Sequence, residues 1–184
     1  MRKVDSQKVC PIAFWLIPAQ PHLEAFRALI FALAREYDAP VFEPHITLHV
    51  GVRTADDDSA KLLRRVAAAS DPITLVAGNT SHNDALFKTL FVEFDDSRLR
   101  ALHGQFQAGL QRFSEYALAP HLSLLYKAMP AESRATLADR HVYAGQRIVF
   151  DEVAAVRPAP GQPDWSDIQM WDSSQRQSLR SRQD

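Results

Sequence analysis

The chain has 184 residues, of which 46% are hydrophobic and 23% are charged, and its formal net charge is −1. This length and composition predict a globular protein with one domain or two small lobes that share a core, and they exclude a disordered chain. The near-zero charge argues against a large surface for duplex nucleic acid, which requires a clearly basic face.

The cysteine count and the first residues of the chain indicate the cellular compartment. Cys10 is the single cysteine, so no internal disulfide can form, and we expect a cytoplasmic protein. The apolar run at 8–17 is interrupted by Pro11 and followed by Pro18, which favours a buried strand over a signal peptide. No run is long enough to span a membrane, so we expect no membrane partner, and no protein partner is evident.

The first half of the chain predicts alternating strands and helices. Short apolar runs next to prolines predict strands, and apolar residues spaced three and four apart predict helices. In chain order we expect a strand at 12–17, a helix at 22–37, a strand at 45–50, a helix at 56–69, a returning strand from 73 to 76, and a polar loop at 79–84.

The second half repeats this order and then adds strands. We expect a strand at 86–94, a helix at 97–113, a strand at 121–126, a helix at 132–141, and further strands at 147–156 and 168–171 joined by a loop at 158–163. The polar segment 175–184 is predicted to be a flexible tail.

These elements predict an α+β fold with two antiparallel sheets that face each other and helices outside them. We expect a single bilobal domain over residues 1–174, in which the lobes cover roughly 9–75 and 76–174 and their ends can cross over. A pseudo-twofold axis would relate the lobes, with a cleft between them.

Two short segments carry the same motif. Residues 44–48 and 120–124 both read proline, histidine, apolar residue, hydroxyl residue and leucine, and they lie 76 positions apart. At this offset the two halves align without a gap from Ala13 and Thr89 onward through both motifs. A chain built from two matched halves can place two histidines and two hydroxyls around one site.

Strand geometry places these polar side chains together. Alternate residues of a strand face the same way, so His45 lies beside Thr47 and His121 beside Ser123. Buried polar groups cost free energy unless they are satisfied, so a water-filled cleft between the lobes is expected here. A histidine has a pKa of about 6.5, so one ring can accept a proton while the other donates one. A strained cyclic phosphodiester suits this chemistry, because the hydroxyls can bind its oxygens.

The paired strands resemble those of the 2H phosphoesterase superfamily, and within it the chain is most similar to the cyclic phosphodiesterases known from plants and yeast. The resemblance covers residues 9–173. Besides the two motifs it rests on the opening strand at 14–18, the strand of the second lobe at 86–91, the tyrosine that ends 120–126, and the pair at 164–165.

The resemblance implies a bilobal fold and the hydrolysis of a cyclic nucleotide phosphate without metal or cofactor. Substrates of the family include ADP-ribose 1″,2″-cyclic phosphate and nucleoside 2′,3′-cyclic phosphates, which are opened to the 2′-phosphate. Two alternatives remain: a 2H enzyme that acts on RNA 3′ termini, and a non-catalytic nucleotide-binding module.

The resemblance also implies residue roles. His45 and His121 would be the acid–base pair, with His121 favoured as the general base and His45 as the general acid. Thr47 and Ser123 would bind the phosphate, and Tyr126 matches a tyrosine of the family that contacts it.

Three further positions have competing interpretations. Trp15 either lines the nucleotide pocket or belongs to the core. Lys88 stands where relatives often carry an uncharged residue, and it either binds phosphate or points to solvent. Tyr126 needs a twist or bulge to share a face with His121. Strict alternation also places His49 beside His45, where the two could bind zinc, but the position that matches His49 is Leu125.

Overall fold

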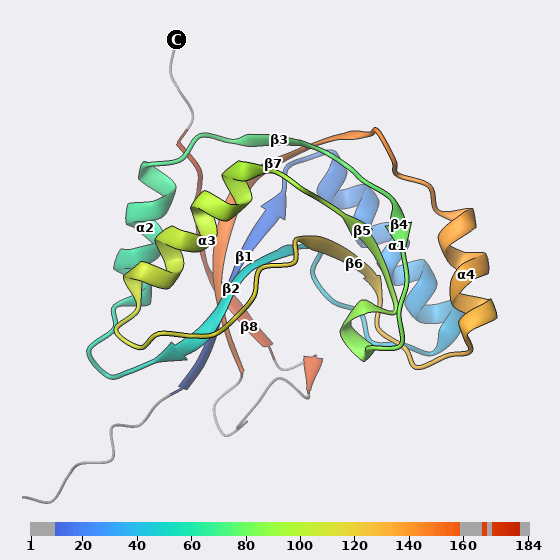
Figure 1. The fold of residues 1–184 in the computed structure, drawn as a ribbon, viewed down its shortest axis with the longest axis horizontal. Coiled ribbons are helices and arrows are strands. Elements are labelled where there is room, and N and C mark those ends of the chain that lie inside the picture. The colour runs from blue at the N-terminus through green and yellow to red at the C-terminus, as the bar shows by residue number, and fades with distance from the viewer. Residues whose placement is uncertain (1–9, 159–166, 169–170, 181–184) are drawn as a thin grey trace, which may run out of the picture.

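The computed structural model describes residues 10–158, 167–168 and 171–180 (Figure 1). Its elements are, in chain order, β1 (Cys10–Pro18), α1 (His22–Tyr37), β2 (Ile46–Arg53), α2 (Ser59–Ala68), β3 (Ile73–Val76), β4 (Thr80–Ser81), the 3-10 helix η1 (Leu86–Lys88), β5 (Leu90–Glu93), α3 (Ser97–Gly109), β6 (His121–Leu125), α4 (Ala131–Arg140), β7 (Arg147–Pro158) and β8 (Trp171–Ser178).

The strands form one antiparallel sheet in the described part of the chain, where two separate sheets were expected. Its order is β3-β7-β1-β2-β6-β5-β4, and β8 pairs with β7 beyond the stretch that β3 occupies. The two lobes meet between β2 and β6, where the register contains a single pair, Ile46 with Leu122. The α+β fold with two lobes is therefore confirmed, but the lobes are joined edge to edge. Because β7 pairs with β1, the end of the chain returns to the first lobe.

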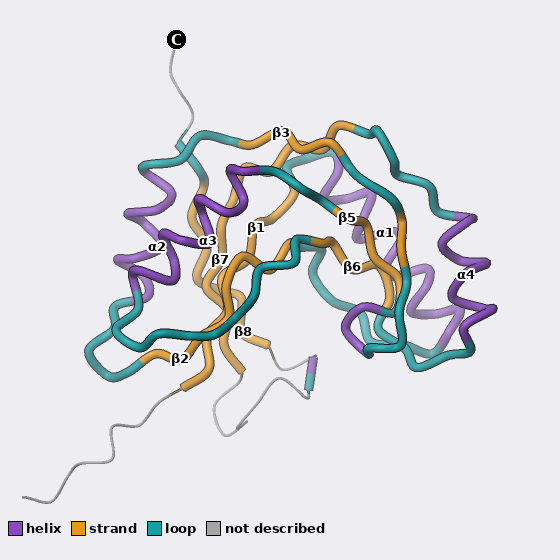
Figure 2. Tube along the Cα trace, viewed as in Figure 1, coloured by secondary structure: helices purple, strands orange, loops and turns teal. Residues whose placement is uncertain are grey.

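The helices exchange between the lobes. Figure 2 shows α2 and α3 gathered at one end of the molecule and α1 and α4 at the other. Helix α1, which follows β1, packs against β6 of the second lobe, and α3, which follows β5, packs against β2 of the first. Helices α2 and α3 approach closely at Gly109, where a Cβ atom would overlap with Leu62 Cδ1, so the absence of a side chain permits the contact.

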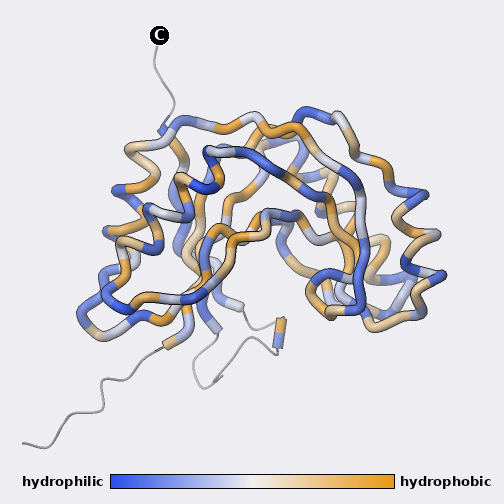
Figure 3. Tube along the Cα trace, viewed as in Figure 1, coloured by the Kyte–Doolittle hydropathy of each residue, from blue (hydrophilic) through white to orange (hydrophobic). Residues whose placement is uncertain are grey.

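The core lies between the sheet and these helices. Phe14 of β1 stacks on Phe106 of α3 at 4.2 Å between ring centroids, and Phe150 of β7 is fully buried nearby. Figure 3 shows hydrophobic stretches along the inner strands, while the helices alternate between hydrophobic and hydrophilic residues. The opposite face of the sheet is left free to carry a site.

Several predicted boundaries are wrong. The predicted strand at 86–94 begins with η1, and the predicted helix at 97–113 ends at Gly109. Residues 175–178, expected in a flexible tail, form part of β8, and Leu179 behind them is buried. The segments 159–166 and 169–170, which include the motif at 164–165 and part of the strand expected at 168–171, lie outside the described residues.

No described helix combines the length and the apolar character that a membrane span requires.

Candidate active site

A pocket of about 280 Å³ opens on the sheet face opposite the helix-packed core. All seven site residues expected from the sequence line it: Trp15, His45, Thr47, Lys88, His121, Ser123 and Tyr126. The remaining lining residues are Ala13, Val50, Phe87, Tyr116, Ala117, Ala119 and Trp171. The structure therefore brings together side chains from both lobes, as the repeated motif predicts.

The two walls of the pocket have the same strand register. Each motif strand carries one extra residue relative to its neighbour, a β-bulge at Leu48 in β2 and at Leu124 in β6. The pairs that flank the bulges are Phe14 with His49, Trp15 with Thr47, Leu90 with Leu125, and Phe91 with Ser123. Every residue of the first two pairs lies 76 positions before its counterpart in the last two. The pseudo-twofold relation thus extends to individual residue pairs of the strand register.

Each bulge shifts the alternation of its strand by one residue. Val50 and Tyr126 consequently line the pocket, while His49 and Leu125 turn toward the core and are buried. The bulge that Tyr126 requires is therefore present. The placement of His49 beside His45 is wrong, so the two rings do not form the zinc pair considered from the sequence.

Both pocket histidines are held in the same way. The Nδ1 of His45 lies 2.6 Å from the carbonyl oxygen of Glu43, and the Nδ1 of His121 lies 2.7 Å from that of Ala119. A carbonyl only accepts hydrogen bonds, so each Nδ1 carries the proton. In the neutral ring Nε2 is then a free acceptor. Each ring is thus prepared to exchange a proton with a ligand through Nε2.

Aromatic rings support the histidines unequally. Trp15 stacks on His45 with 3.6 Å between ring centroids and 10° between planes. At the matching position of the second lobe, Phe91 meets His121 edge-on at 5.3 Å. Trp15 is also 4% exposed and packs among core residues, so it both lines the pocket and belongs to the core.

The hydroxyl groups sit beside the histidines. The Ser123 hydroxyl donates to the carbonyl oxygen of Phe87 at 2.9 Å, and the Thr47 side chain is half-buried at the pocket wall. Burial raises the pKa of Tyr126 well above its usual range, so this hydroxyl stays protonated and can donate a hydrogen bond. The pocket therefore holds these three neutral hydroxyl groups, and the proton of Ser123 is already donated to the Phe87 carbonyl.

Burial disfavours the protonated form of both histidines. Burial and, to a lesser extent, the nearby His121 lower the pKa of His45 to about 3, against the opposing effect of the Glu43 carbonyl. Burial also lowers the pKa of His121, opposed by the Ala119 carbonyl and assisted by the positive charge of Lys88. His121 is the more exposed ring of the two.

Lys88 gives the pocket a positive charge. It is half-buried on η1, and its Nζ lies 5.9 Å from the centroid of the Phe91 ring. Among the described residues that line this pocket, none is acidic. Lys88 therefore lines the pocket, where its charge is available to an anionic ligand.

Of the lining residues that were not singled out from the sequence, three are aromatic: Phe87, Tyr116 and Trp171. Phe87 lies in a segment that carries the family resemblance, and that was the one signal available for it. Tyr116 comes from the irregular segment after α3. Trp171 is the first residue of β8, whose polar sequence is not typical of a strand. Trp171 meets Trp15 edge-on at 5.7 Å and closes one end of the pocket.

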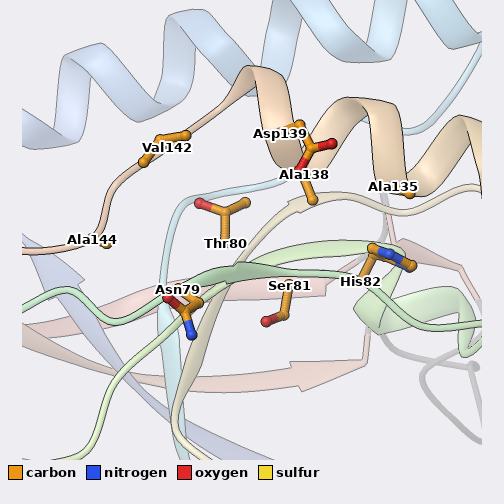
Figure 4. A pocket seen from close by; sticks show the side chains of 9 residues that line it. All are labelled: Asn79, Thr80, Ser81, His82, Ala135, Ala138, Asp139, Val142 and Ala144. Carbon is orange, nitrogen blue, oxygen red and sulfur yellow. The ribbon is translucent and has the colours of Figure 1, made fainter.

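A second hollow of about 510 Å³ lies between β4 and α4 (Figure 4). Thr80 in its wall donates a hydrogen bond to the carbonyl oxygen of His141. Its lining contains a single histidine, His82, with no matching partner across the hollow. The smaller pocket is therefore the candidate active site, because it holds the paired proton-transfer groups.

The sequence is similar to those of cyclic phosphodiesterases. Residues 10–98 match the family described as cyclic phosphodiesterase-like protein. A cyclic phosphodiesterase of Arabidopsis thaliana is 24% identical over 126 residues, which are 65% of this chain and 67% of that protein.

Solved structures share the fold. TT0787 of Thermus thermophilus superposes with a TM-score of 0.58 at 17% identity, over 94% of this chain and 99% of that chain. LigT of Escherichia coli, in a complex with 3′-AMP, has a TM-score of 0.58 at 14% identity, over 95% of this chain and 100% of its own. Likeness at this level of identity establishes the architecture.

Proposed function

We propose that the chain, whose residues 10–98 match the cyclic phosphodiesterase-like family, is a 2H phosphoesterase that hydrolyses a cyclic phosphodiester on a small nucleotide by acid–base catalysis with two histidines and without a metal. The observation that carries this proposal is the matched pair of rings. His45 and His121 each donate Nδ1–H to a backbone carbonyl and keep Nε2 for the same pocket.

The proposed reaction adds one water molecule across a phosphorus–oxygen bond. A neutral histidine takes a proton from water as its oxygen bonds to phosphorus. The bond from phosphorus to one ring oxygen breaks, and the other histidine, in its protonated form, gives that oxygen a proton. The products are a phosphate monoester and a free hydroxyl. Thr47, Ser123 and Lys88 would stabilise the charge on the non-bridging oxygens.

The pKa shifts favour one assignment of these roles. His45 is the harder ring to protonate, which suits a general base, and the more exposed His121 would gain its proton when an anionic substrate binds. This is the reverse of the assignment favoured from the sequence. With His121 as the acid, kcat/KM falls as pH rises through the His121 pKa.

The substrate proposed is ADP-ribose 1″,2″-cyclic phosphate or a nucleoside 2′,3′-cyclic phosphate, the latter opened to the 2′-phosphate. Lys88 supplies charge for the phosphates, and the aromatic rings of Trp15, Phe87 and Trp171 supply stacking surface for a base. An RNA 3′ terminus that carries a cyclic phosphate is the alternative substrate.

The test is hydrolysis of these nucleotides and of a short RNA ending in a cyclic phosphate, with EDTA throughout. We expect turnover on a small nucleotide, and a loss of roughly 10²- to 10⁴-fold in both His45→Ala and His121→Ala. Turnover that requires an added metal would contradict the proposal, as would activity retained in either folded variant. Turnover on RNA alone would select the alternative substrate.

A phosphodiester with a p-nitrophenol leaving group separates the two roles, because this group departs without a proton. The variant that lacks the general acid should recover much of its activity on it, while the variant that lacks the base should not. We expect recovery in His121→Ala. Recovery in His45→Ala would reverse the assignment.

A further inference from the structure

Glu43 lies immediately before the first motif and is bound by two arginines from separate elements. Arg27 of α1 contacts both carboxylate oxygens, with Nη2 at 2.6 Å from Oε1 and Nε at 3.2 Å from Oε2. Arg176 of β8 places Nη1 at 3.2 Å from the same Oε1, and equally 3.2 Å from Oε1 of Glu152 on β7. A bidentate contact of this kind restrains the orientation of the carboxylate as well as its position.

The same residue orients His45. The carbonyl oxygen of Glu43 accepts the Nδ1–H of His45, and residues 39–45, which include both, lie in no helix or strand. The backbone at Glu43 therefore depends on its side chain for part of its position. The two arginines connect α1 and β8 to the carbonyl that determines the tautomer of the ring.

The second lobe lacks this arrangement. The residue that matches Glu43 is Ala119, whose carbonyl holds His121 in the same way but whose side chain offers no contact to a charge. The two walls agree in their bulges and in their Nδ1 hydrogen bonds, and they differ here. The additional restraint belongs to His45 alone.

We propose that Glu43, clamped by Arg27 and Arg176, is a positioning residue that fixes the tautomer and orientation of His45. It touches no substrate and acts through its backbone carbonyl. The inference that this matters for turnover rests on the proposed function, whereas the effect on the ring itself does not. Strand β8 thereby supports the reaction from outside the pocket.

The test combines imidazole ¹⁵N NMR with steady-state kinetics. In Glu43→Ala we expect the ¹⁵N shifts of His45 to move from a single Nδ1–H tautomer toward a mixture, while those of His121 stay unchanged. We expect kcat to fall roughly 10- to 100-fold with KM little changed, because misplaced catalytic groups cost rate more than binding. Arg176→Met should move both readouts in the same direction. Glu43→Gln, which can still accept a hydrogen bond from an arginine, should lie between.

Arg157→Met is the matched control. It breaks another ion pair between β7 and β8, Arg157 with Asp172 at 3.1 Å, and leaves the contacts of Glu43 intact. We expect the His45 tautomer to be unchanged in this variant. An unaltered His45 spectrum in folded Glu43→Ala, or in Arg176→Met if Glu43→Ala does not fold, would overturn the proposal. So would an equal change in Arg157→Met. The spectra remain decisive even if no cyclic nucleotide is hydrolysed, so the two proposals fail separately.

Discussion

The fully buried His49 shows how one residue can follow the motif and yet lie outside the site. Neither of its ring nitrogens has a hydrogen-bond partner among the described residues, and its ring lies 5.1 Å from that of His103. Burial, together with the charge of His103, lowers its pKa to about 4. The matching position in the second lobe is Leu125, which fills the equivalent space with an apolar side chain.

We therefore expect His49→Leu to stabilise the fold, by about 1 kcal/mol at neutral pH, because an unsatisfied buried polar group is removed. The gain should grow as pH falls from 6.5 toward 4. The folded pKa lies below the unfolded one, so the unfolded chain binds the extra proton and stability is lost with acid. Urea unfolding at pH 7.5 and 5 measures both effects.

His103→Leu is the comparison for this substitution. It removes a hydrogen bond between Nδ1 and the carbonyl oxygen of Leu48, so it should not stabilise the fold. A wild-type dependence of stability on pH that survives unchanged in His49→Leu would contradict the explanation.

The sequence predicts seven residues that line one pocket, but it predicts the facing of the strand residues only in part. Two histidines and two hydroxyls recur at one spacing, and that repetition distinguishes them from isolated strand residues. The sequence could not predict which face of the sheet the His49 side chain is on. A bulge depends on the pairing of two strands, and neither Leu48 nor His49 is a residue type that signals one. Hydrophobic alternation describes a regular strand and fails where the strand is irregular.

At the scale of elements, β8 is the part that sequence patterning misses. Its eight residues are largely polar, so they show neither alternation nor an apolar run. The strand is held instead by backbone pairing with β7 and by charges, including Arg176 with Glu152 and Arg157 with Asp172. Such pairings join residues far apart in sequence, which local patterns cannot register.

The position of β8 predicts a role in substrate affinity. Trp171→Ala removes the ring that closes the pocket beside Trp15, and we expect KM for a nucleotide substrate to rise about tenfold, because stacking of a base on an aromatic ring contributes on the order of 1–3 kcal/mol. The kcat should change less, since the histidines are not displaced. Steady-state kinetics measures both parameters.

Trp171→Phe keeps an aromatic face and should retain most of the affinity. An unchanged KM in Trp171→Ala, or the same rise in Trp171→Phe, would show that stacking on this ring does not hold the substrate.

At the scale of the whole molecule, the repeat predicts two related lobes but not the way they are joined. The single pair of Ile46 with Leu122 joins the two lobes within one sheet, and the exchanged helices α1 and α3 complete each core with a segment from the other half. The sequence of either half does not show that its helix packs on the other lobe, because the apolar face of a helix does not indicate which strands it covers.

Exchange also predicts that neither half folds alone. We expect fragments 1–78 and 79–184 each to lack a cooperative unfolding transition, and to regain both a folded circular dichroism spectrum and activity when they are produced together. A stable fold in the isolated first fragment, which would lack its strand partners β6 and β7, would contradict this expectation.

The matched registers of the two walls have a consequence for the origin of the pocket. A half-length chain carries one histidine, one hydroxyl and one bulge, which form a site only when a second copy faces the first across a twofold axis. Duplication and fusion of such a half-chain would free the two copies to diverge. The matched positions now differ at Trp15 and Phe91, at Val50 and Tyr126, and at Glu43 and Ala119. Two identical walls treat both sides of a phosphorus atom alike. A cyclic phosphodiester presents water on one side and a departing sugar oxygen on the other, and two walls that differ can each be adapted to one of these sides.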